Sequence, residues 1–160
     1  LSLPCLRMRS GAGPVFTVFR LAGLYGPGRN ALVQLAQGRA RYLDRPGTLF
    51  NRVHVEDVCS AIQASIEAPA SSAGDATWLL ADDLPASPRD VFAHAARLSG
   101  RALPPPLADD DPTISPALQR FYAGSKRIDN RASKTGLGWT LRYPSYVEGL
   151  AAAWAAGDGR

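Results

Sequence analysis

Two short segments of this chain place polar side chains where a small-molecule site needs them. Arg29 follows Gly28 and precedes a predicted helix, so it could meet an anionic ligand with help from the helix N-terminus. A solvated loop arginine is the alternative. His54 titrates in the range of a general base, but we prefer a structural hydrogen bond to the backbone. Glu56 and Asp57 favour a helix start over catalysis, because carboxylates stabilise the positive end of a helix.

Arg29 ends a segment, Phe16 to Arg29, whose pattern predicts a ligand site. The segment opens on apolar and β-branched residues typical of a buried parallel strand, residues 15–19. A Gly-Pro-Gly turn follows, and Asn30 can cap the next helix. Open α/β sheets bind ligands beyond the carboxyl ends of their strands. We therefore expect a small-molecule site where this strand ends.

The rest of the pattern predicts short extended segments alternating with helices. Extended segments are expected at 52–55 and 77–81, and a strand pair or extended loop at 39–50. Helices are expected at 31–37, from Glu56 to before Pro69, from Pro88 to Gly100, at 115–122, up to Thr135 and at 145–156. Residues 103–116 read as a long surface connection. This outline has two or three strands, and nothing before Phe16 is expected to supply neighbours to the first.

Composition is that of one globular domain. The 160 residues are 46% hydrophobic and 20% charged. A net charge of +4 comes from dispersed Lys and Arg residues, so we expect no nucleic-acid partner. No apolar run is long enough to span a membrane. Cys5 and Cys59 fit neither a metal site nor a disulfide framework, which favours a cytoplasmic protein with Cys59 as a small core residue.

Four segments in order resemble the C-terminal half of an extended short-chain dehydrogenase/reductase of the NAD-dependent epimerase/dehydratase type. They are FRLAGLYGPGR (19–29), RVHVEDV (52–58), WLLADDLP (78–85) and SKRIDN…LGW…YPSYVEGL (125–150). The resemblance covers roughly residues 15–154, and its specificity comes from the order of the segments. Residues 1–14 stay unassigned, and residues 15–160 form the expected domain. The first residue is Leu, which indicates a cropped, processed or partly sequenced chain.

The resemblance implies the C-terminal portion of a Rossmann-like doubly wound α/β fold, with an incomplete sheet and a small helical substrate lobe. It implies NAD or NADP as the cofactor of a full-length parent, and a small-molecule substrate. Tyr25 could cover the nicotinamide pocket or belong to the core. The residues that the resemblance assigns to cofactor binding are Leu21, Ala22, Gly23 and Tyr25, and those assigned to the substrate are Arg29, Arg52 and His54.

Two parts of the family's machinery are missing from these residues. No G-x-G-x-x-G follows a strand and opens a helix, since Gly11 and Gly13 precede a proline and a strand. The family's Tyr-x-x-x-Lys is absent from its usual place upstream of the opening loop. Tyr122 and Lys126 match that spacing by number, which we interpret as accidental. We therefore name no catalytic residue and no metal site, and expect the isolated chain to be inactive and to bind no dinucleotide tightly.

Two departures concern the substrate. Family members acting on sugar nucleotides often have Asn where Gly23 stands, and Arg where Phe50 stands. Losing an amide and a bidentate phosphate clamp argues against a nucleotide-sugar substrate. The alternative to an enzyme fragment is a non-enzymatic truncated homologue or interaction module. It would self-associate or pair with another protein through the exposed edge of the first strand.

Overall fold

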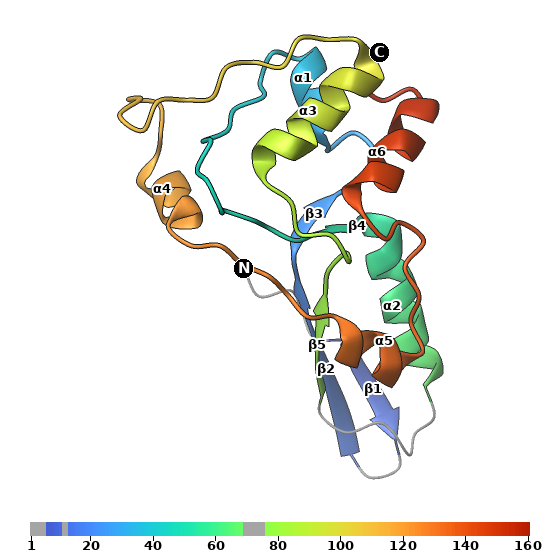
Figure 1. Ribbon diagram of the computed structural model, residues 1–160. Coiled ribbons are helices and arrows are strands. Elements are labelled where there is room, and N and C mark those ends of the chain that lie inside the picture. Colours follow the sequence, from blue (N-terminus) through green and yellow to red (C-terminus); the bar gives the residue numbers. More distant parts are fainter. Residues whose placement is uncertain (1–5, 11–12, 69–75) are drawn as a thin grey trace.

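The computed structural model describes residues 6–10, 13–68 and 76–160, which fold as a mixed α/β structure (Figure 1). This confirms the predicted α/β class with an incomplete sheet. Five strands and six helices occur in the described part. They are β1 (Leu6–Ser10), β2 (Gly13–Leu21), β3 (Gly23–Tyr25), α1 (Ala31–Ala36), β4 (Arg52–His54), α2 (Val55–Glu67), β5 (Ala76–Leu80), α3 (Pro88–Ser99), α4 (Pro116–Tyr122), α5 (Arg131–Leu137) and α6 (Tyr146–Ala155).

The main sheet has the order β1-β2-β5, with β2 in the middle. Strand β5 runs parallel to β2, with Phe19 opposite Trp78, whereas β1 pairs antiparallel with β2. The expectations that nothing before Phe16 supplies a neighbour, and that the first strand lies at an edge, are therefore wrong. Ser10 lies opposite Gly13, so a short segment before Phe16 does pair with β2.

Only one face of this sheet is covered in the described part of the chain. Helices α2 and α5 lie beside it (Figure 1), and Phe19 and Trp78 point into an apolar cluster around Val53, Leu80 and Trp139. Side chains of alternate residues face the other way, as the period of a strand requires. Exposed hydrophobics on that other face are Phe16, Val18 and Leu79, at 41%, 36% and 37% exposure. The apolar run of the first strand predicted that the strand is buried on both faces, and this prediction is wrong.

The chain changes sheet partner at Ala22. The Ala22 N–H donates to the carbonyl of Leu80 in β5, at 2.9 Å, and the Gly23 N–H donates to the carbonyl of Asn51, at 3.2 Å. From Gly23 onward the backbone forms β3, which pairs in parallel with β4. One continuous segment therefore joins the main sheet to a small two-stranded sheet above it (Figure 1).

Helices α1, α3 and α6 form a lobe above the two-stranded sheet (Figure 1), and their apolar faces share one cluster that includes Leu32, Phe92 and Leu150. Local sequence defines their ends. Asn30 accepts hydrogen bonds from two N–H groups of the first turn of α1. Ser87 caps α3, and Gly100 ends α3 in the left-handed region that glycine adopts without strain. Among the described residues, no helix combines the length and apolar character that a membrane crossing needs.

Residues 37–51 lack regular helix or strand and run as an extended connection along one side of the lobe (Figure 1). Of the two predicted alternatives for 39–50, the extended loop is therefore the observed one. Phe50 and Ala86 exchange backbone hydrogen bonds, each at 3.1 Å, which ties this connection to the residues before α3. Cys59 is exposed, so its predicted core position is wrong: the buried face of α2 carries Val58 and Ala61 instead.

Candidate functional site

A cleft of about 780 Å³ opens where β2 ends and β4 begins, and we call it the strand-end cleft. Its lining comes from five parts of the chain: the junction of β2 and β3, the turn before α1 with α1 itself, the extended connection with the start of β4, the first half of α3, and the end of α4 with the residues that follow it. The lining residues are Leu21, Ala22, Gly23, Arg29, Gln34, Arg41, Phe50, Asn51, Arg52, Pro88, Phe92, Tyr122, Lys126 and Ile128.

Arg52 supplies the innermost positive charge. Its Nη1 donates to the carbonyls of Phe50, at 3.1 Å, and Ala86, at 3.2 Å, which are the two residues of the backbone contact described above. Burial lowers the pKa of the guanidinium, and the nearby Asp82 opposes this. These two bonds use one of the three nitrogens of the guanidinium group. Among the described residues, Nε and Nη2 have no hydrogen-bond partner.

A buried polar network supports this arginine from behind. Oδ1 of Asp82 accepts from the Arg52 N–H, at 3.0 Å, and from the Asn51 amide, at 3.2 Å. Oδ1 of Asn51 accepts from the Ile128 N–H, at 2.7 Å. Burial raises the pKa of Asp82 to about 6, and its Oδ2 is buried with no partner in the described part. The network therefore fixes the Asn51–Arg52 segment and the Ile128 segment, which both line the cleft, relative to each other.

Five of the seven predicted binding residues line this one cleft: Leu21, Ala22, Gly23, Arg29 and Arg52. They come from the strand end, from the turn before α1 and from β4, so the fold brings together residues up to 31 positions apart, from Leu21 to Arg52. At the strand end Ala22 presents a methyl group and Gly23 only its backbone. A Cβ added at Gly23 would lie 3.4 Å from the Asn51 carbonyl oxygen and 3.7 Å from Cγ of Arg52.

Tyr25 and His54, the other two predicted binding residues, do not line the cleft. The Tyr25 hydroxyl donates to the carbonyl of Ser145, at 3.3 Å, and burial raises its pKa. Nδ1 of His54 accepts from the Glu56 N–H, at 3.3 Å, and caps α2. The His54 ring packs against the Tyr25 and Tyr143 rings. His54 thus makes the backbone bond that we preferred for it, and contact of Tyr25 with the cofactor and of His54 with the substrate stays a prediction.

Glu56 and Asp57 lie in the first turn of α2, as predicted. The buried Asp57 carboxylate accepts from the N–H groups of Arg142, at 2.6 Å, and Tyr143, at 3.1 Å. Glu56 forms an ion pair with Arg142 at 2.8 Å. Both acids therefore anchor the segment before α6 and lie outside the cleft.

Sequence reasoning missed Arg41 and Phe92, and it dismissed Tyr122 and Lys126, all of which line the cleft. Long-range contacts place them. The Lys126 N–H donates to the carbonyl of Leu49, at 2.9 Å, which brings the segment after α4 to the extended connection. No local periodicity marks such contacts. The unusual spacing of Tyr122 and Lys126 is the one signal that could have drawn attention to them.

Tyr122 does not have the electrostatics of a catalytic tyrosine. Burial raises its pKa, whereas a tyrosine that exchanges protons near neutral pH needs a lowered one. The cations that oppose this rise are Arg52 and Arg45, and Lys126 is not among them. The ring instead packs edge-on against Phe50, with centroids 5.5 Å apart. We therefore assign Tyr122 to the cleft wall.

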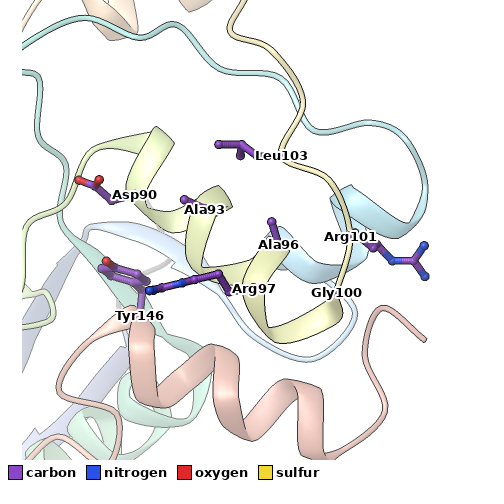
Figure 2. Close-up of a pocket in the computed structure, with 8 residues that line it drawn as sticks. All are labelled: Asp90, Ala93, Ala96, Arg97, Gly100, Arg101, Leu103 and Tyr146. Atoms are coloured by element: carbon purple, nitrogen blue, oxygen red, sulfur yellow. The ribbon is translucent and has the colours of Figure 1, made fainter.

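A second hollow, of about 710 Å³, lies between α3, α6 and the residues after α3, and we call it the helix hollow (Figure 2). Figure 2 shows Arg97 extending toward the Tyr146 ring and Arg101 pointing away from it. The charged groups of this hollow have protein partners. Asp90 accepts from Ser87 at 2.7 Å, Arg97 contacts His94 at 3.0 Å, and Arg101 donates to the Gly159 carbonyl at 3.0 Å.

Comparison with known proteins connects this architecture to solved relatives. A functionally unknown conserved protein from Silicibacter pomeroyi is 41% identical, with a TM-score of 0.79, over 89% of this chain and 49% of that chain. A Methylobacillus flagellatus protein described as an NAD-dependent epimerase/dehydratase is 28% identical, with a TM-score of 0.63, over 88% of this chain and 46% of that one. Solved proteins bound to NAD or NADPH, among them a UDP-glucuronic acid 4-epimerase from Bacillus cereus, share the fold at identities under 25%.

A curated relative from a Streptomyces species is named a 3-diazoavenalumate denitrifying reductase. It is 26% identical over 144 residues, which are 83% of this chain and 45% of the relative. No family model matches the sequence. The chain thus spans about half the length of the proteins that it matches.

Proposed function

We propose that the chain is the C-terminal half of an extended short-chain dehydrogenase/reductase of the NAD-dependent epimerase/dehydratase type, and that it forms the substrate-side wall of a nicotinamide cleft. The dinucleotide-binding wall and the proton donor would come from residues beyond these 160. The observation that carries the proposal is the convergence of Leu21, Ala22, Gly23, Arg29 and Arg52 on one cleft at a strand end.

The residues present fit the nicotinamide end of the cofactor. Ala22 and Gly23 offer backbone and small side chains, so a flat ring can approach closely. NAD or NADP, when bound, supplies hydride transfer. Arg29 and Arg52 would orient an anionic group of the substrate for this transfer. Tyr25 and His54, through their hydrogen bonds and their ring contact, would keep β3 and β4 in place.

A reductase is our preferred activity within this family. This preference follows the reductase name of the curated relative. We propose that the isolated chain is inactive, because its sequence contains neither a G-x-G-x-x-G loop at a strand–helix junction nor an activated Tyr-Lys pair.

The test joins this chain to the part of the Silicibacter pomeroyi protein that it does not match. The expected result is saturable NADH or NADPH binding by the chimera, seen as a change in cofactor fluorescence, and none by the chain alone. Micromolar dinucleotide binding by the chain alone would contradict the proposed division of labour. A well-folded chimera that binds neither nucleotide would contradict the proposed cofactor role.

A second candidate is a protein-interaction module, which the exposed apolar face with Val18 and Leu79 favours. Size-exclusion chromatography with light scattering separates the two candidates. A stable stoichiometric dimer of the chain would favour the module. A chain that aggregates alone, but becomes a stable monomer when it is joined to the unmatched part of the Silicibacter pomeroyi protein, would favour the enzyme half.

A further inference from the structure

The strand-end cleft is rich in hydrogen-bond donors and poor in acceptors. Four cations line it, and no Asp or Glu does. Of its two side-chain amides, that of Asn51 is already bonded to Asp82 and to the Ile128 N–H. Gln34 carries the other side-chain amide, and the Tyr122 hydroxyl already has the backbone of Leu43 as a hydrogen-bond partner. A ligand that needs to donate several hydrogen bonds finds few partners here.

The four cations are also not neutralised by ion pairs. The five ion pairs within the described residues use Arg45, Arg89, Arg131, Lys134 and Arg142. Arg41 and Arg52 each donate to backbone carbonyls through one nitrogen. The side chains of Arg29 and Lys126 have no hydrogen-bond partner in the described part of the chain. Asp82 is the nearby carboxylate, and it lies buried behind Arg52 rather than in the lining.

The walls between these cations are apolar and include flat rings. Phe50 and Tyr122 pack edge to face, and Phe92 closes the side formed by α3. Leu21 and Ile128 extend the same apolar surface. Burying the apolar surface of a ligand against these walls lowers the free energy of binding. The hydroxyl groups of a sugar would stay without hydrogen-bond partners here, which costs free energy.

We propose that the substrate is a ring-sized apolar organic acid whose oxyanion group, a carboxylate or a phosphate, binds Arg52. Arg52 holds it with the two guanidinium nitrogens that the carbonyls leave open, and Arg29, Arg41 and Lys126 attract it from the rim. The body of the acid lies against Phe50, Phe92 and Tyr122. This assignment rests on the proposed function, because it names the substrate class of that same cleft.

Nitrogen–proton correlation NMR spectra of the 160-residue chain test the assignment directly. The probes are benzoate, its neutral analogue benzamide, phenyl phosphate, and inositol monophosphate as a polyol of similar ring size. We expect benzoate and phenyl phosphate to shift the amide signals of Gly23 and Arg52, with affinities about tenfold above those of benzamide and inositol monophosphate respectively. The ratio of the two aromatic affinities identifies the preferred oxyanion.

Substitutions locate the interaction. Arg52→Met should weaken benzoate binding about a hundredfold and Arg52→Lys about tenfold, because lysine keeps the charge but loses the fork. The matched control, Arg97→Gln with Arg101→Gln in the helix hollow, should leave binding unchanged. Should Arg52→Met fail to fold, Phe92→Leu provides a second variant, with weaker binding of phenyl phosphate but no change for inositol monophosphate.

Equal binding of benzamide and benzoate, or of the two phosphates, would overturn the assignment, as would signals that shift only around the helix hollow. The dinucleotide experiment on the chimera involves none of these probes. Anion binding by the chain with no dinucleotide binding by the chimera would therefore contradict the proposed function alone, and the reverse result would contradict the substrate class alone.

Discussion

The strand-end cleft and the helix hollow have similar volumes, about 780 and 710 Å³, but they differ in how many of their charged side chains have a protein partner. In the hollow, Asp90, Arg97 and Arg101 each contact a protein group. In the cleft, Arg29 and Lys126 extend without a described partner, and Arg52 uses one nitrogen of its fork. Size alone therefore does not separate a binding site from a gap between helices.

The difference follows from how each region is assembled. Residues 90–103 and Tyr146 surround the hollow, and its polar groups serve to cap α3 and to close the C-terminal residues against it. The cleft is assembled from five separate segments, and its buried network holds Asn51, Arg52 and Asp82 in fixed positions. The lesson is that unpaired donors on a rigid, non-local frame identify the site better than volume does.

The largest effect on stability is expected at the contact between α6 and β3. Helix α6 carries Tyr146 of the helix hollow, and β3 lies next to the cleft. A Cβ at Gly149 would lie 2.0 Å from the Tyr25 hydroxyl oxygen and 2.7 Å from Cζ. Gly149→Ala should therefore lower the free energy of unfolding by about 2–3 kcal/mol through overpacking. Urea denaturation measures this. Gly124→Ala, which has nothing within 4 Å, is the matched control, and equal stability of the two variants would show that the two regions are not held together at this contact.

The buried network behind the cleft should make folding depend on pH. The pKa of Asp82 is raised from 3.8 to about 6, so the folded state binds a proton more readily than the unfolded chain. The contribution of this group to stability therefore falls as the pH rises from 3.8 to about 6. Asp82→Asn should remove that fall and raise stability at neutral pH by about 2 kcal/mol.

Thermal unfolding followed across this pH range tests the role of Asp82. Asp110→Asn, in an exposed loop, serves as the control. An Asp82→Asn profile parallel to that of the unchanged chain would mean that the carboxylate is solvated, and the cleft would then lack the rigid frame that separates it from the hollow.

The rim of the cleft should respond to charge and to salt. Arg29→Gln combined with Lys126→Gln should weaken benzoate binding about tenfold in dilute buffer, and less in concentrated salt, because exposed charges are screened. Titration at two ionic strengths measures both effects. An unchanged affinity would show that Arg29 and Lys126 do not contribute to anion binding, which would then depend on Arg52 and its neighbours.

The smallest effect concerns the helix hollow. Gly100 ends α3 with φ of +65°, and a Cβ there would meet nothing within 4 Å. Gly100→Ala should cost about 1 kcal/mol from the left-handed backbone alone. Thermal unfolding checks the value. Benzoate affinity should stay the same, and any loss of affinity would show that the helix hollow and the strand-end cleft are energetically coupled.

Local patterns predicted the helices of this chain well, because their signals lie within a few residues. Ser87, Pro88 and Gly100 mark both ends of α3, and Asn30 and Ser145 cap α1 and α6 as their types predict. The strand β1 was missed because its pairing depends on a hairpin rather than on its own pattern. Cys59 was misplaced because one step along a helix turns a residue through about 100°, from the core to the solvent.

The cleft was predictable only where the resemblance carried it. Leu21, Ala22, Gly23, Arg29 and Arg52 belong to segments that match the family, and they line the same space. Arg41 and Lys126 could not be placed, since the contact of the extended connection with the segment after α4 has no local signature. The unpaired state of the rim cations is likewise a property of three-dimensional neighbours and not of spacing.

The change of sheet partner at Ala22 and Gly23 has a consequence for directed evolution of this cleft. A Cβ at position 23 would lie in van der Waals contact with Cγ of Arg52, at 3.7 Å, and the Gly23 N–H is bonded to the carbonyl of Asn51. Any side chain introduced at position 23 would therefore touch the Arg52 side chain. A mutant library that varies positions 23 and 52 together samples combinations of side chains that libraries of single substitutions leave out.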